Sequence, residues 1–206
     1  MKTRSFISAL IALQVLAAVS SQAAIIYSGL KDFTITNDFD GIYLDVDAGN
    51  LVAYNAPTGW DINPFFGGQG IANSPAFQPV RTSTALYAPV VNLAPGQTVG
   101  VGAASMFGSG FNGSGDPVSH VGTGLGQFAS GAEGYLGFKL TTNASAGPYY
   151  GWMRVVLSNT GSTGLIRDWA YENSGNDIVI SAVPEVSYAT LPLICAGSLM
   201  LRRRRK

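Results

Sequence analysis

The sequence predicts an all-β domain, and three observations indicate it. The chain of 206 residues contains 26 glycines, about twice the usual proportion, and they are concentrated in its central part. Apolar residues at helical spacing are nearly absent there. The apolar residues instead form short runs, rich in β-branched and aromatic side chains, that Gly, Asn, Asp or Pro residues bound. Short strands separated by turns in this way are typical of an antiparallel β-sandwich or jelly roll.

Five short strands are expected in the first half of this central part. Segments 33–36, 42–46 and 51–54 each hold β-branched or aromatic residues, and the turns between them are rich in Asp, Asn and Gly. Segments 87–93 and 98–101 are rich in Val and lie on either side of a Pro-Gly turn. Their length suits the strands of a sandwich.

The last third carries the clearest strand pattern, in segments 135–141, 149–158, 165–171 and 177–182. Side chains of a strand alternate between its two faces. In 149–158 this alternation places Tyr150, Trp152 and Arg154 on one face and a second set of side chains on the other. That second set is Tyr149, Met153, Val155 and Leu157.

A ligand platform is one hypothesis for the aromatic and cationic residues of these strands. In 165–171, Arg167 and Trp169 point to the same side if the alternation is regular. Pairing of the two strands across the turn at 159–164 would stack them against Trp152 and Arg154 as a ladder on which a sugar ring can lie. Packing of the same aromatic residues in the core is the alternative.

Two long loops are expected, at 64–79 and 102–132. The second contains Gly108-Ser109-Gly110-Phe111-Asn112-Gly113, which matches the letters of a dinucleotide-binding fingerprint. That motif requires a helix directly after the glycines. Asp116-Pro117 follows instead, so nucleotide binding is not expected.

The N-terminus predicts a secretory signal peptide over residues 1–23. Lys2 and Arg4 precede an apolar run over 6–19, and Ser21-Gln22-Ala23 provides small residues at the two positions that signal peptidase reads. Cleavage after Ala23 is expected, which makes the secretion translocon the first partner of the chain. The exported domain then covers residues 24–182.

The C-terminus, residues 183–206, has three parts. A short polar motif, Val183-Pro184-Glu185 with Ser187, precedes an apolar segment at 186–201, and five cations end the chain: Arg202, Arg203, Arg204, Arg205 and Lys206. As a helix, 186–201 reaches about 24 Å against a hydrocarbon core of about 30 Å, so it predicts a short transmembrane helix. The cations should stay in the cytoplasm.

This tail resembles the PEP-CTERM sorting domain. The resemblance rests on Pro184-Glu185, the apolar segment and the terminal arginine run, and it covers about 25 residues; Val186 stands where the family usually has a second proline. It implies an exosortase-type membrane enzyme as partner, processing near Pro184-Glu185, and delivery to the cell surface or extracellular matrix in the context of exopolysaccharide and biofilm. A tail anchor that is never processed is the alternative.

Charge and cysteine content exclude several classes of function. The domain at 24–182 holds five cations and eleven acids, a net charge of −6, so nucleic acid is not an expected partner. The single cysteine, Cys195, lies in the apolar tail, which leaves the domain without disulfides or thiolate metal sites.

Calcium is the one metal that the sequence suggests, and the alternative is an acidic turn that binds no ion. Asp38 and Asp40 lie two residues apart before Gly41 and offer the oxygen ligands that calcium prefers. Asp45 and Asp47 share a strand face, which we expect to be solvated. No other cofactor is expected.

Catalysis is not expected. His120 is the only histidine, and no nucleophile motif accompanies it. We therefore expect a structural or adhesive surface protein, with a carbohydrate-binding module for exopolysaccharide as the alternative. A secreted hydrolase is a third hypothesis, and it requires a cleft with two close carboxylates.

Overall fold

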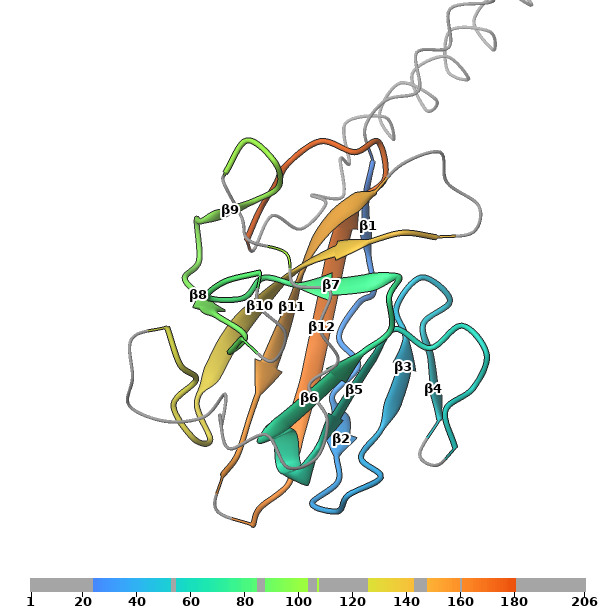
Figure 1. The fold of residues 1–206 in the computed structure, drawn as a ribbon, viewed down its shortest axis with the longest axis vertical. Helices are drawn as coiled ribbons and strands as arrows, with labels where there is room; N and C mark the ends of the chain where they lie inside the picture. The colour runs from blue at the N-terminus through green and yellow to red at the C-terminus, as the bar shows by residue number, and fades with distance from the viewer. Residues whose placement is uncertain are drawn as a thin grey trace, which may run out of the picture.

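The computed structural model describes residues 24–52, 55–84, 88–103, 107, 126–142, 148–159 and 161–180. These residues form an all-β domain whose sheets are antiparallel, with one short 3-10 turn, η1 (Phe66–Gly68) (Figure 1). The predicted all-β class is confirmed.

The larger sheet is built on three long strands near the C-terminal end of the domain. They are β10 (Glu133–Leu140), β11 (Tyr149–Val156) and β12 (Gly164–Glu172), and each pairs with the next. Short strands complete the edges of this sheet. β1 (Ile25–Tyr27) and β2 (Phe33–Ile35) both pair with β12, and β7 (Phe77–Pro79) and β8 (Asn92–Leu93) both pair with β10.

The smaller sheet has the order β4 (Asn50–Val52), β3 (Tyr43–Asp45), β5 (Ile62–Phe65) and β6 (Gly70–Asn73). A separate pair joins β9 (Thr98–Val99) to β13 (Ile178–Val179).

Buried side chains of both sheets meet in one hydrophobic core. The smaller sheet contributes Leu44, Ile62 and Ile71, and the larger sheet contributes Phe138 and Met153 among others. Burial of this apolar surface is the main force that holds the two sheets together.

The opposite face of the larger sheet is also covered. A second cluster there contains Tyr150, Trp152 and Ala170, with Val99 and Ile178 from the β9–β13 pair. The alternation predicted for β11 is confirmed, because Met153, Val155 and Leu157 lie in the first core while Tyr150 and Trp152 lie in the second.

Each predicted strand overlaps an observed one, but the loop expected at 64–79 is wrong. That segment holds the end of β5, η1, β6 and β7. Every residue of β5 is buried, so the strand lacks the polar alternation that would reveal it. Of the loop expected at 102–132, most lies outside the described residues, and Phe128 near its end is fully buried.

Candidate functional site

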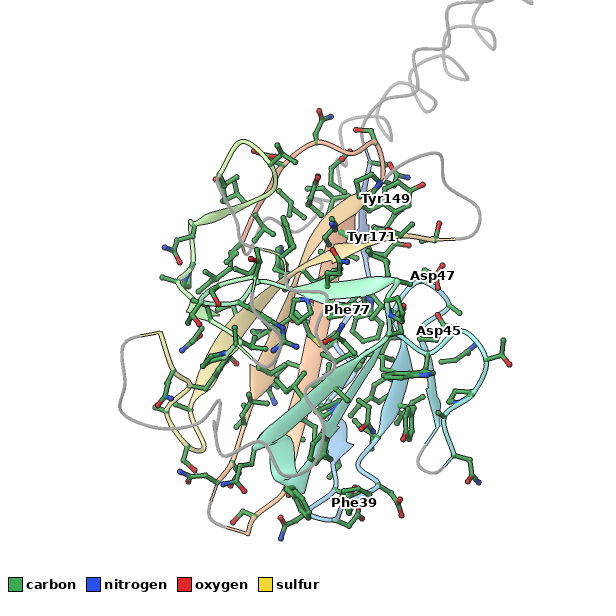
Figure 2. All side chains as sticks on the ribbon, viewed as in Figure 1. Phe39, Asp45, Asp47, Phe77, Tyr149 and Tyr171 are labelled. Atoms are coloured by element: carbon green, nitrogen blue, oxygen red, sulfur yellow. The ribbon has the colours of Figure 1, made fainter. Side chains whose placement is uncertain are left out.

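Three carboxylates come together at one end of the smaller sheet. Asp45 ends β3, Asp47 lies in the turn that follows, and Asp61 immediately precedes β5. One oxygen from each lies within 4.8 Å of the others. Figure 2 labels Asp45 and Asp47 beyond the upper ends of β3 and β4.

Backbone pairing fixes this cluster. The Asp61 N–H donates to the Leu44 carbonyl (2.9 Å), and Asp61 Oδ2 accepts from the Val46 N–H (2.7 Å). Asp45 Oδ1 accepts from the Ala48 N–H (2.9 Å). The side chain of Asp61 is therefore held under the turn, with only 3% of the residue exposed.

Burial and crowding raise the pKa of two of these carboxyls. Desolvation is the main cause for Asp61, whose pKa rises to about 7. For Asp47 the hydrogen bond with Asp45 comes first, then burial and the negative charge of Asp45, and together they raise its pKa to about 6. Like charges this close favour retention of a proton or binding of a cation.

The cluster opens into a pocket of about 590 Å³ between the smaller sheet and the end of β10. Trp60 forms part of the wall, and its ring meets the Tyr43 ring edge-on at 5.3 Å between centroids. Thr58 and Thr141, whose side chains carry hydroxyls, also line the pocket. An aromatic wall beside hydroxyls and carboxylates is suited to a polar ligand with an apolar face.

The chemistry of the pocket permits two roles. The three carboxylates can supply oxygen ligands to a hard cation such as calcium. The hydrolase hypothesis needs two close carboxylates in a cleft, and this pocket brings three carboxylates within 4.8 Å of one another.

The predicted calcium pair, Asp38 and Asp40, is not part of this cluster. Asp38 Oδ1 accepts from the Thr36 hydroxyl (3.0 Å) and from the Gly41 N–H (2.8 Å), so it closes its own turn. Asp45 and Asp47 do not share a solvated strand face: Asp47 is exposed but lies in the turn after β3, and an oxygen of each lies within 4.8 Å of an oxygen of the buried Asp61. The sequence around Asp45 and Asp47 does not predict the position of Asp61, because the pairing of Leu44 with Ile62 is what brings Asp61 beside them.

The predicted aromatic platform is wrong for its two tryptophans. Trp152 and Trp169 are each 2% exposed, and they belong to the cores on opposite faces of the larger sheet. Trp152 stands opposite Ala170, whereas Trp169 stands opposite Met153 and donates from Nε1 to the Val46 carbonyl (3.0 Å).

A β-bulge in β12 is the physical reason. Arg154 stands opposite Asp168, but the next residue of β11, Val155, stands opposite Ile166, so Arg167 is the extra residue. The bulge shifts the alternation of β12 by one. Ile166 and Trp169, three residues apart, therefore point into the same core.

The two arginines of the predicted platform are engaged in ion pairs. Arg154 Nε donates to Asp168 Oδ1 (2.9 Å), and a second guanidinium nitrogen contacts Oδ2 of this buried carboxylate. The Tyr27 hydroxyl donates to the same Oδ2 (2.8 Å). Arg167 pairs with Asp32 (2.9 Å), and Glu133 lies 3.6 Å and 3.7 Å from the two guanidinium groups.

The sorting residues lie outside the described part of the chain. These are Ala23, Val183, Pro184, Glu185, Ser187 and the cations from Arg202 to Lys206, and the predicted helix at 186–201 and His120 lie outside it too. Within the described residues, no helix has the length and apolar character needed to span a membrane.

Comparison with known proteins identified no relative of this chain. No protein-family model, no curated protein and no solved structure matches this chain.

Proposed function

We propose that this chain is an exported protein of the cell surface or extracellular matrix, with a β-sandwich domain between a signal peptide and a PEP-CTERM-like sorting tail. The observation that carries the proposal is the order of the tail: Pro184-Glu185, an apolar segment and five terminal cations. The signal peptide at 1–23 supports the same orientation, with the domain outside the cell. The role is structural or adhesive rather than enzymatic, in an exopolysaccharide or biofilm matrix.

The intact mass of the native protein tests this proposal. We expect a mature chain that begins at Ala24 and lacks Arg202 to Lys206, because the translocon and an exosortase-type enzyme process the two ends. Replacing Pro184 and Glu185 together by alanine should leave the cationic end attached. Ser5→Ala, within the signal peptide but away from its cleavage site, is the matched control. A native mass that retains the five cations would refute processing of the tail.

Carbohydrate binding is the second candidate, and the pocket at Asp45, Asp47 and Asp61 favours it. Trp60 offers an aromatic face, and the hydroxyls and carboxylates around it offer hydrogen-bond partners for sugar hydroxyls. The ligand in this candidate is the exopolysaccharide of the same cell, with calcium bridging it to the three carboxylates.

A glycan array with the full-length chain tests the second candidate, with and without calcium. Trp60→Ala should abolish retention, and Leu30→Ala, an exposed residue outside the pocket, is the control. Retention that Trp60→Ala leaves unchanged would exclude this pocket, and no retention on any glycan would exclude the candidate. Release of reducing sugar during the assay, lost in Asp61→Asn, would instead favour the hydrolase.

A further inference from the structure

Three phenylalanines form a cluster at one tip of the domain. Phe39 lies between β2 and β3, Phe65 ends β5, and Phe66 begins η1. Their ring centroids lie 5.5 to 6.2 Å apart. Phe65 is buried, but Phe39 is 58% exposed and Phe66 is 38% exposed. Figure 2 places Phe39 at the lower end of the molecule, away from Asp45 and Asp47.

The backbone at this tip holds Phe66 in a strained conformation. Its φ is +50°, which is an outlier for a bulky side chain. The neighbouring backbone imposes it, because the Phe66 N–H donates to the Asp38 carbonyl and the Gly67 N–H donates to the Thr36 carbonyl, both at 2.9 Å. Strain of this kind persists where the surroundings over-determine it, and such sites are often functional.

The Phe66 ring remains partly in solvent. Gly67 and Gly68, which follow, also have positive φ and carry it without cost. Gly67 packs so closely on the Ser162 carbonyl that a Cβ would lie 2.2 Å from it, so the turn cannot shift easily. The result is a pair of aromatic faces, Phe39 and Phe66, presented in a fixed arrangement.

The charge beside these rings is negative. Asp38 and Asp40 flank Phe39 in the sequence, and Asp40 is exposed. In the described part of the chain, the ion pairs found involve neither of them. A lysine or arginine side chain can interact with both the exposed rings and the carboxylates of the tip. Its aliphatic stem packs on a ring, and its cation interacts with the ring face. The neighbouring carboxylates balance its positive charge.

We propose that this aromatic tip, formed by Phe39, Phe65 and Phe66 with Asp38 and Asp40, docks a polypeptide partner through exposed lysine or arginine side chains. Charge complementarity favours this partner. A second copy of the chain is a less suitable partner, because two facing tips would bring like charges together. A lipid bilayer is also less suitable, because inserting Phe39 would carry the neighbouring carboxylates toward the apolar layer. The surface is separate from the Trp60 pocket and does not depend on the proposed function.

Fluorescence anisotropy with a labelled hexalysine peptide tests the proposal, using the full-length chain in a nonionic detergent. Phe39→Ser and Phe66→Gly leave the net charge unchanged, so general attraction to the acidic domain is the same in both variants. We expect each to weaken binding about 2- to 5-fold, the effect of one exposed cation–π contact. Val101→Ser removes an exposed apolar side chain elsewhere, 75% exposed, and should bind like the unmodified protein.

Thermal unfolding of the same variants separates docking from a structural role. Glycine accepts a positive φ but removes the ring contacts with Phe65, so these two effects oppose one another and Phe66→Gly should change Tm little. Equal peptide affinity in all variants would overturn the proposal, as would a lower Tm in Phe66→Gly with unchanged affinity. Binding to phosphatidylcholine vesicles or to dextran that Phe39→Ser abolishes would assign the tip to lipid or glycan and overturn it too. If Phe66→Gly does not fold, Phe39→Ser decides alone.

Discussion

Replacing Asp61 by asparagine should stabilise the folded protein at neutral and alkaline pH. Asp61 is almost fully buried, and its desolvated carboxyl has a pKa of about 7 instead of the usual 3.8. Asparagine keeps an oxygen that can accept from the Val46 N–H, as Asp61 Oδ2 does now. The substitution therefore removes the buried charge while keeping the hydrogen bond that positions the turn.

The direction of the pH dependence follows from whether the folded or the unfolded state binds the Asp61 proton more tightly. The folded state binds it up to about pH 7 and the unfolded state only up to about pH 4. The contribution of Asp61 to stability is therefore fully present below pH 4 and is lost as the pH rises to about 7. The difference between the two pKa values corresponds to about 4 kcal/mol. For a domain of this size, that is on the order of 10 °C in Tm.

Thermal unfolding by circular dichroism, from pH 4 to pH 8 in a chelating buffer, measures this effect. The Tm of Asp61→Asn should exceed that of the unmodified protein at pH 8 and match it at pH 4. Asp40→Asn, an exposed carboxylate outside the cluster, should show no such divergence. Parallel Tm curves for Asp61→Asn and the unmodified protein would refute the reasoning, since Asp61 would then be ionised in the folded state throughout.

Three further measurements address other features. Calcium should stabilise the folded protein at pH 8 and so raise Tm; at a calcium concentration of 100 times Kd, the unfolding free energy should increase by about 2.7 kcal/mol. Asp45→Asn should reduce this increase. If calcium does not raise the Tm of the unmodified protein, calcium binding is excluded. Asp168→Ala should lower the unfolding free energy by about 1.5–3 kcal/mol in urea denaturation, because it removes the charged hydrogen bonds to Arg154, which is itself partly exposed and keeps Glu133 nearby; a loss below about 1 kcal/mol would contradict this. Gly67→Ala should destabilise far more than Gly96→Ala, since both have positive φ but only Gly67 lies against a backbone carbonyl. Equal Tm losses in these two variants would show that close packing is not the cause.

The fold was predictable where one face of a strand differs from the other. Strand β11 alternates between two cores, and its sequence shows this directly. Strands β5 and β6 are short and buried nearly throughout, so their sequences show no alternation of polar and apolar residues. Without that alternation, the Pro and the glycines of the segment indicate a loop. Periodicity carries information about a strand only where burial alternates.

The candidate site was predictable only in part. Asp45 and Asp47 are visible as a pair in the sequence, but Asp61 joins them through strand pairing across a long turn. The predicted platform is wrong for a different reason. A regular alternation of β12 would put Arg167 and Trp169 on the same face. The extra residue at the bulge puts them on opposite faces, and nothing in the local sequence marks the bulge.

The same bulge makes β12 unusually tolerant of losing a residue. A deletion within a regular strand turns every side chain on one side of it to the wrong face. In β12, removing Arg167 would leave Ile166 and Trp169 two residues apart, which is the spacing that keeps both in the first core. The shortened strand would lose the ion pair with Asp32 and become regular, so one gap at this position in a related sequence would leave both cores intact.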